Sequence, residues 1–155
     1  MDLGEATIRS LDWAQYRIKT GDASQFGDQL IRLLHSRDAT ESLEVWRNIE
    51  NHVVSQDTIY DAAEPTVDSI LAALVEERPD HVKAMIIDLL FLLLNGGSVE
   101  DPNLSGRCRA RAMRGTWLLV REAANGPEWV RDAVLEVLEL VDAGTAAALR
   151  AWLDS

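Results

Sequence analysis

The sequence of 155 residues has one cysteine, three histidines and no long apolar segment. Because Cys108 has no second cysteine to pair with, an internal disulfide framework is excluded. The most apolar stretch, residues 84–94, is shorter than the roughly 18 residues that span a bilayer, and it contains Asp88. The first residues lack the basic, apolar and small-residue order of a signal peptide. We therefore expect a cytoplasmic protein with no membrane segment.

Basic residues are scarce: 15 Lys and Arg stand against 26 Asp and Glu, which gives a formal net charge of −11. Phosphate groups repel such a chain, so we expect no nucleic acid and no membrane surface among its partners. A chain of this length buries about 68 to 70% of its unfolded surface, which is enough for one core without metal or disulfides. We expect a single domain over residues 1–155.

Motifs that carry catalysis or bind cofactors are also missing. None of His35, His52 and His81 has the H-E-x-x-H or E-x-x-H spacing of a helical metal site. No P-loop, G-x-G-x-x-G or G-x-S-x-G motif occurs. These absences predict a protein that is not an enzyme and that holds no metal and no cofactor.

Two residues keep a chemical alternative open. Cys108 lies between Arg107 and Arg109, and neighbouring cations can lower a thiol pKa enough to make it reactive. Asp88 lies within the most apolar stretch, where a carboxylate is costly unless it is paired. We favour structural roles, with Cys108 as a small apolar residue and Asp88 facing a helix end or an arginine. In the chemical alternative the chain is a small helical enzyme or ligand carrier.

The pattern of apolar residues predicts helices almost throughout. Apolar residues recur at intervals of three and four, without strand-like alternation. Gly, Pro, Asn and Asp at the ends of these segments divide the chain into seven or eight helices. We expect them at about residues 6–20, 23–36, 40–53, 65–77, 80–95, 107–124, 127–141 and 145–153. The fifth is apolar around nearly its whole circumference, which predicts a central position.

The helices also show a repeat. Similar residues lie 40 positions apart in several pairs, among them Leu30 and Ile70. A period of about 40 to 47 residues with two helices per unit is typical of HEAT and armadillo repeats. We predict an all-α fold, a short stack of antiparallel helical hairpins of the HEAT/armadillo-like α-solenoid type, with an ordinary helical bundle as the alternative. Its expected parts are a capping helix in residues 1–22, two repeats in 23–97, a loop at 98–106, and a last repeat with a C-terminal cap in 107–155.

One short segment carries a resemblance to a known family. In SQDTIYDAAEPTVDSIL the matching residues are Gln56, Thr58, Tyr60, Ala62, Pro65 and Val67. The segment resembles a pattern in small bacterial, mainly actinobacterial, HEAT-like repeat proteins of unassigned function. Ser55 stands where that pattern has His, and Asp57 where it has Gly. The resemblance implies an all-helical repeat fold and no catalysis.

The residues of this segment also have a structural interpretation of their own. Tyr60 can bury its ring and place its hydroxyl on a helix end. Thr58 can cap the following turn, and Pro65 fits the first turn of a helix. We therefore interpret Gln56, Thr58, Tyr60 and Pro65 as a structural motif, and a ligand site is the less favoured alternative.

The clearest surface feature is a stripe of arginines. If residues 107–124 form one helix, a single face carries Arg107, Arg111, Arg114 and Arg121. The next helix has an acidic stripe of Glu128, Asp132, Glu136 and Glu139. Antiparallel packing of these helices would pair the two stripes internally, which is the interpretation we favour. Otherwise the arginines are free to bind an acidic partner.

The five tryptophans fall into two groups. Trp46, Trp117 and Trp129 lie on or beside apolar stripes, so we expect them in the core. Trp13 and Trp152 lie near the chain ends, where we expect them to cap the stack. If they are exposed instead, they are anchors for a partner, because Trp is enriched at binding hot spots.

Together these patterns favour a non-catalytic protein-protein interaction module of the HEAT-like repeat type. Its expected partner is another protein, of basic or mixed charge, and the candidate binding residues are Arg107, Arg111, Arg114 and Trp13. One alternative is an immunity or inhibitor protein that neutralises a basic toxin or enzyme, because a strongly acidic surface steers a basic protein toward it. Another is an architectural unit of a larger assembly.

Overall fold

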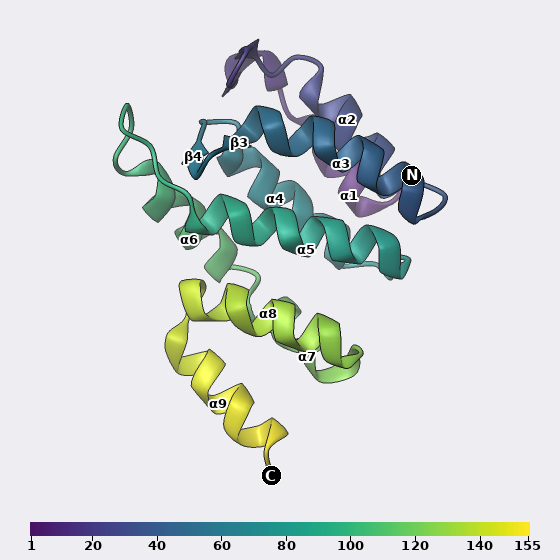
Figure 1. Cartoon of the computed structure of the whole chain (residues 1–155), viewed down its shortest axis with the longest axis vertical. Coiled ribbons are helices and arrows are strands. Elements are labelled where there is room, and N and C mark those ends of the chain that lie inside the picture. The colour runs from purple at the N-terminus through teal and green to yellow at the C-terminus, as the bar shows by residue number, and fades with distance from the viewer.

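The computed structural model describes residues 1–155, and the chain is mainly helical (Figure 1). Its α-helices are α1 (Leu3–Ser10), α2 (Phe26–Leu34), α3 (Ala39–Val53), α4 (Ala63–Leu74), α5 (Asp80–Asn95), α6 (Leu104–Met113), α7 (Thr116–Asn125), α8 (Glu128–Val141) and α9 (Ala143–Leu153). A short 3-10 helix, η1 (Trp13–Gln15), follows α1. The strands are β1 (Arg17–Ile18), β2 (Gly21–Asp22), β3 (Val54–Ser55) and β4 (Thr58–Ile59). The prediction of an all-α fold is confirmed in this broad sense.

The helices form neighbouring rows that are visible in Figure 1. Helices α3, α5 and α8 lie side by side, each in contact with the next. Helix α4 packs against α5, and it also contacts α1 and α6. Helix α7 packs against α8, and α9 leaves the end of the molecule in contact with α8 and α7. No helix is both long enough and apolar enough to cross a bilayer.

Helix α5 occupies the central position that its apolar circumference predicts. It contacts α3, α4, α6 and α8. Its inward side chains, including Ile86, Leu89, Leu90 and Leu93, are at most 1% exposed. They belong to one apolar cluster of 38 buried residues that runs from Ile8 to Leu149. Burial of this continuous surface is the main stabilising force of the fold.

Several helix ends follow from local sequence. The carboxylate of Asp38 accepts a hydrogen bond from the Glu41 backbone N–H at 2.8 Å, as expected of the residue before α3. Asp142 accepts from Thr145 N–H at 3.0 Å and so caps α9. Pro65 lies in the first turn of α4, as predicted.

The structure contains two β-hairpins at positions where the sequence predicted a helix or a turn. The predicted helix at residues 6–20 ends at Ser10, and β1 then pairs with β2. In the second hairpin β3 pairs with β4, and the two residues between them, Gln56 and Asp57, have φ of 49° and 65°. Positive φ at both central residues is typical of the type I′ turn that matches strand twist. The loop after α5 adds a partner, because Ile59 N–H donates to the Gly97 carbonyl at 2.9 Å.

The resemblance segment therefore forms a hairpin and a helix start. Gln56 is exposed at the turn, and Thr58 is an exposed β4 residue whose side chain accepts no capping hydrogen bond. Tyr60 is half-buried and its hydroxyl forms no hydrogen bond, so the expected contact with a helix end is not formed. The side-chain contacts expected of Thr58 and of the Tyr60 hydroxyl are therefore not formed.

The single helix predicted at residues 107–124 is broken into α6 and α7 at Gly115. A Cβ atom at Gly115 would lie 2.5 Å from Leu71 Cδ2, so any larger residue would force the Leu71 side chain of α4 to move. The break turns α7 away from the axis of α6.

Candidate functional site

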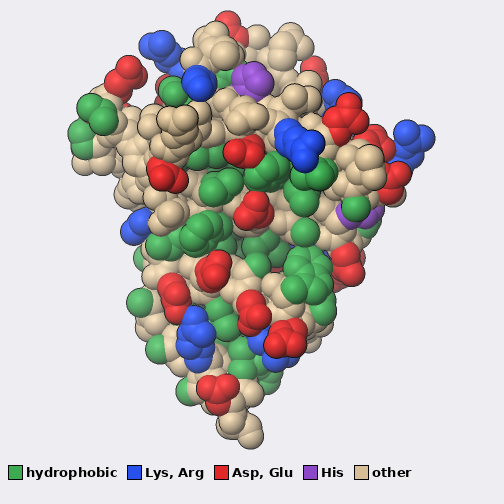
Figure 2. All heavy atoms as spheres, viewed as in Figure 1, with side chains coloured by type: hydrophobic (Ala, Val, Ile, Leu, Met, Phe, Trp, Pro, Cys, Tyr) green, Lys and Arg blue, Asp and Glu red, His purple; other side chains and the backbone are tan.

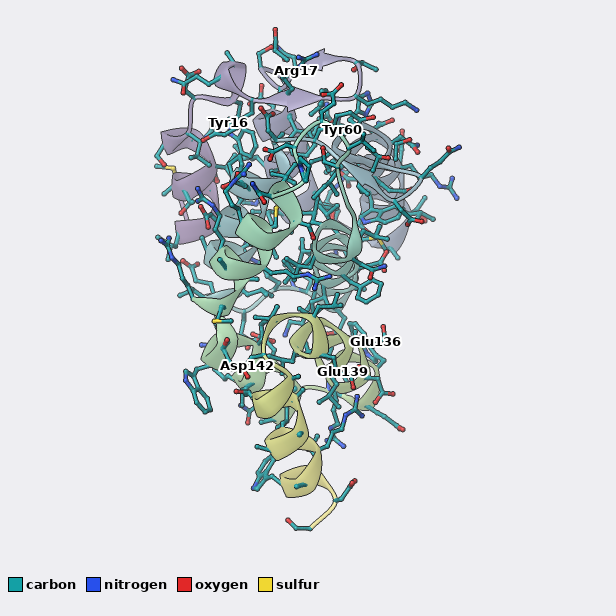
Figure 3. The ribbon with its side chains drawn as sticks, turned by 90° about the vertical axis from the view of Figure 1, so that its left-hand side faces the viewer. Tyr16, Arg17, Tyr60, Glu136, Glu139 and Asp142 are labelled. Atoms are coloured by element: carbon teal, nitrogen blue, oxygen red, sulfur yellow. The ribbon has the colours of Figure 1, made fainter.

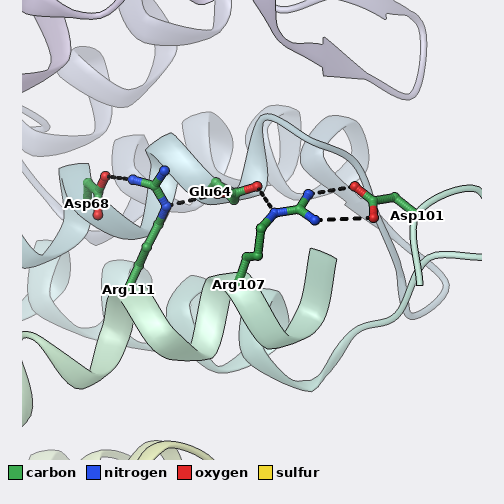
Figure 4. A network of polar contacts seen from close by, with 5 residues as sticks. All are labelled: Glu64, Asp68, Asp101, Arg107 and Arg111. Atoms are coloured by element: carbon green, nitrogen blue, oxygen red, sulfur yellow. Dashed lines mark hydrogen bonds and ion pairs between the residues drawn. The ribbon is translucent and has the colours of Figure 1, made fainter. Parts of the chain in front are cut away.

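The arginines of α6 are used inside the molecule. Arg107 Nε lies 2.7 Å from Glu64 Oε1, and its Nη2 lies 2.5 Å from Asp101 Oδ2 (Figure 4). Arg111 Nε lies 2.9 Å from the other oxygen of Glu64, and its Nη1 pairs with Asp68. The hydrogen bond from Arg107 lowers the pKa of Asp101. These pairs join α6 to α4 and to the preceding loop, and they neutralise both cations.

Internal pairing of this stripe was the favoured interpretation, but the predicted partners are wrong. No arginine of α6 forms an ion pair with the predicted partners on α8, which are Glu128, Asp132 and Glu136. The break at Gly115 is the physical reason, because α7 and not α6 runs beside most of α8. Helix α6 instead packs its arginines on α4.

Of the remaining arginines in this region, two form hydrogen bonds and one does not. Arg109 Nε donates to the Leu94 carbonyl at 2.9 Å, and Arg121 Nη2 donates to the Leu74 carbonyl at 2.7 Å. Arg114 is exposed and has neither a hydrogen bond nor an ion pair from its side chain. Of the three arginine candidates, only Arg114 is therefore free at the surface.

The tryptophans divide differently from the prediction. Trp13 is only 6% exposed, and its Nε1–H donates to the Ile8 carbonyl at 2.9 Å while its ring packs on Phe26. It therefore seals the N-terminal end and offers no anchor to a partner. Trp117 and Trp129, which were expected in the core, are 75% and 40% exposed. For Trp117 the reason is the break at Gly115, which gives α7 a different inward face from α6.

Cys108 and Asp88 do not form a common pocket. The Cys108 side chain is fully buried, and burial raises its pKa to about 12 even though Arg107 and Arg111 are near. A thiol with this pKa is not a nucleophile at neutral pH. Asp88 lies on the exposed side of α5, so the expected contact with a helix end or an arginine is not formed. No group of three or more His, Cys, Asp and Glu residues is placed to hold a metal ion.

A different set of residues forms a charged face on α3, α5 and α8. These three helices carry nine acidic and three basic residues. One of the bases, Lys83, is buried and paired with Glu122 of α7 at 3.0 Å, so it contributes nothing to the exposed surface. The row of α4, α6 and α7, in contrast, carries four basic and three acidic residues. We call the exposed side of α3, α5 and α8 the acidic face.

The centre of the acidic face is a pair of like charges. Asp88 of α5 and Glu136 of α8 lie near each other on adjoining helices, and neither side chain has an ion pair or a hydrogen bond. The pKa of Asp88 is raised, first because its surroundings partly remove it from water and second because Glu136 is close. In Figure 3, Glu136 and Glu139 project to the side that faces the viewer in Figure 1. Two unneutralised carboxylates at this position attract a cation.

Apolar side chains surround these acids. Figure 2 shows hydrophobic groups between the acidic ones over the row of α3, α5 and α8. The half-buried apolar residues of the three helices include Trp46, Met85, Leu92, Ala133 and Leu140. Sequence analysis missed this face because it treated α5 as apolar all round. The spacing of Ala84, Asp88 and Leu92 at four residues was the available signal for an exposed stripe.

Comparisons of this chain with protein-family models, with curated proteins and with solved structures find no match.

Proposed function

We propose that this protein is a non-catalytic protein-interaction module of the HEAT-like helical-repeat type, and that its acidic face binds a basic protein segment. The repeat interpretation is supported by the hairpin order of the helices. Helices α2 and α3, α4 and α5, and α7 and α8 pack as successive neighbours, and the second helix of each pair lies beside the next. Stacks of this kind present one helix row as an extended binding surface.

The observation that carries the proposal is the unpaired Asp88 and Glu136 within a partly apolar face. Glu64 of α4, in contrast, is neutralised by both Arg107 and Arg111. The partner we infer has Lys or Arg placed to meet these carboxylates and apolar side chains placed to meet Trp46 and Leu92. Charge then speeds and orients the encounter, and apolar contact contributes most of the affinity.

An amphipathic basic helix tests this proposal directly. A labelled peptide with Lys on one face and Leu on the other should bind the protein, as followed by fluorescence anisotropy. The matched peptide with Glu in place of Lys should not bind. Asp88→Asn with Glu136→Gln preserves the shape of the site and removes both charges, so this double variant should weaken binding by about tenfold or more.

The control must change net charge equally at another place. Asp28→Asn with Glu100→Gln removes two exposed, unpaired acids that lie outside the three helices. If both double variants weaken binding to the same degree, attraction is a property of net charge alone and the acidic face is not the site. Raised salt should reduce the difference between wild type and the Asp88 and Glu136 variant.

The inhibitor alternative uses the same face, and the excess of nine acidic over three basic residues on its helices also supports it. In that case the partner is a basic toxin or enzyme, and complex formation abolishes its activity. A candidate partner encoded beside this gene would be assayed with and without the protein. If wild type abolishes the activity of this partner and the Asp88 and Glu136 variant does not, the result favours inhibition over simple scaffolding.

A further inference from the structure

The end of the molecule opposite the N-terminal hairpin has an apolar groove between α7 and α9. Its volume is about 440 Å³, and its lining includes Trp117, Val120, Ala148, Leu149 and Trp152. The two indoles at its rim are 75% and 60% exposed. Large aromatic side chains at this exposure are unusual on a chain that buries Trp13 fully against Phe26.

The hollow follows from the sequence of α9. Gly144, Ala148 and Trp152 are spaced by four residues, so they share one side of the helix. The first two have almost no side chain, and space therefore remains between α9 and α7 before the ring of Trp152. A protruding indole and an empty hollow thus lie on the same surface.

The exposed apolar area is large enough for a weak, reversible contact. Aromatic side chains bury about 150 to 250 Å² each, and Trp117, Trp152 and the nearby Met113 are all more than half exposed. Together they expose about 400 Å², within the range of the largest apolar patch on a monomer. This is about half of the roughly 800 Å² per partner of a standard interface, so the contact should be reversible and should dissociate on dilution.

The distribution of charge favours a second copy of this chain as the occupant. Residues 104–155 contain seven arginines and seven acidic residues, so this part is neutral and the whole net charge of −11 lies in residues 1–103. Two copies that meet at this end keep their acidic bodies apart. Of the charges beside the groove, Arg114 and Asp154 are unpaired. Arg114 precedes α7, and Asp154 follows α9.

We propose that two copies associate through this groove about a two-fold axis. Helix α9 of each copy packs antiparallel to α9 of the other, and Trp152 of each fills the hollow of the other. The antiparallel arrangement places Arg114 opposite Asp154 of the second copy. The same patch serves both subunits, as a closed two-fold interface requires, and Gly144 and Ala148 permit the helices to approach closely.

Sedimentation velocity over a concentration series tests the proposal. Wild type should be a dimer that dissociates on dilution. Ala148→Glu places a charge in the hollow at an exposed position where Glu suits a helix, and it should leave a monomer with an unchanged circular dichroism spectrum. Trp152→Ala should weaken association at least about 30-fold, the fold-change of a hot spot. Trp129→Ala removes an exposed indole outside the groove and should leave association unchanged.

A spectroscopic readout separates this contact from any other dimer. Acrylamide quenching of tryptophan fluorescence should rise on dilution in wild type, as Trp117 and Trp152 become accessible, and should be independent of concentration in Ala148→Glu. A protein that is monomeric at all concentrations would overturn the proposal, as would a dimer that Ala148→Glu leaves intact. Basic-peptide binding should survive Ala148→Glu because the acidic face lies on other helices, so the two proposals fail independently.

Discussion

Lys83 and Glu122 form the ion pair in which both side chains are most deeply buried. Their side chains are 9% and 5% exposed, and Lys83 Nζ lies 3.0 Å from Glu122 Oε2. The pair joins α5 to α7 across the molecule. Burial alone lowers the pKa of Lys83, but Glu122 and the more distant Glu77 outweigh it and raise that pKa. The lysine therefore remains charged in the folded state.

Lys83→Met tests what this pair contributes. The substitution keeps an unbranched side chain in the same space and removes the positive charge, so Glu122 remains buried without its main partner. Loss of one member of a buried pair costs about 3 to 5 kcal/mol. Arg121 Nη2 lies 3.3 Å from the other oxygen of Glu122, and we therefore expect the lower end, about 3 kcal/mol. This is a large part of the roughly 5 to 15 kcal/mol that stabilises a typical domain.

The double variant Lys83→Met with Glu122→Leu separates charge from packing. Because it removes both buried charges, it should recover most of the stability and lie within about 1 kcal/mol of wild type. Urea unfolding followed by circular dichroism measures each variant, with equal m-values as the check on a two-state transition. The only other lysine, Lys19, is exposed, and Lys19→Met should change stability by less than about 0.5 kcal/mol.

Two results would refute this reasoning. A loss below about 1 kcal/mol for Lys83→Met would mean that water or Arg121 compensates Glu122 fully. A double variant as unstable as Lys83→Met alone would mean that the unpaired charge of Glu122 is not the cause of the loss.

Three further results are expected. Leu89→Ala, at a position with no exposed surface, should cost about 2 to 5 kcal/mol in urea unfolding; a loss below about 0.5 kcal/mol would place Leu89 outside the core. The hydrogen bond from Arg78 lowers the pKa of Asp2 to about 2, so Asp2 adds about 1 to 2 kcal/mol above pH 4, after allowance for solvent screening, and this is lost as the pH falls through 2. Asp2→Asn should flatten that acid limb of a stability profile, and an unchanged limb would contradict the assignment. Asp57→Gly, at φ 65° in the turn between β3 and β4, should increase the free energy of unfolding by about 0.5 kcal/mol and so raise the melting temperature slightly. A lower melting temperature would contradict the type I′ assignment.

The parts of the fold that were predictable depend on local patterns. The apolar circumference of residues 85–94 predicts the burial of α5, and Asp38 predicts the start of α3. Both are properties of one helix and its immediate flanks. Gln56 and Asp57 show the limit, because two-residue strands are too short for alternation to appear and the hairpin depends on a bond to the distant Gly97.

The break at Gly115 depends on a contact that periodicity does not reveal. Gly115 lies against Leu71, which is 44 positions earlier in the chain, and the apolar period continues through it. This break also changes which residues meet at the candidate site. Arg111 turns to Glu64 and Asp68 instead of the acids of α8, and Trp117 moves from the expected core to the surface.

The acidic face depends on how the helices are ordered in space. Its acids come from three segments separated in sequence by α4, α6 and α7, whose own charges are nearly balanced. A count along the chain therefore gives only the net charge, and the segregation is apparent only when α3, α5 and α8 are placed in one row. Partial removal of Asp88 from water, and secondly repulsion from Glu136, raise the pKa of Asp88, so the folded state holds its proton more tightly than the unfolded chain and the ionised carboxylate works against folding. A position that lowers stability and could be relieved by Asn is typical of a site kept for binding. Asp88→Asn should accordingly stabilise the protein near neutral pH while weakening its affinity for the basic peptide, and a variant that loses both stability and affinity would show that Asp88 is a structural residue.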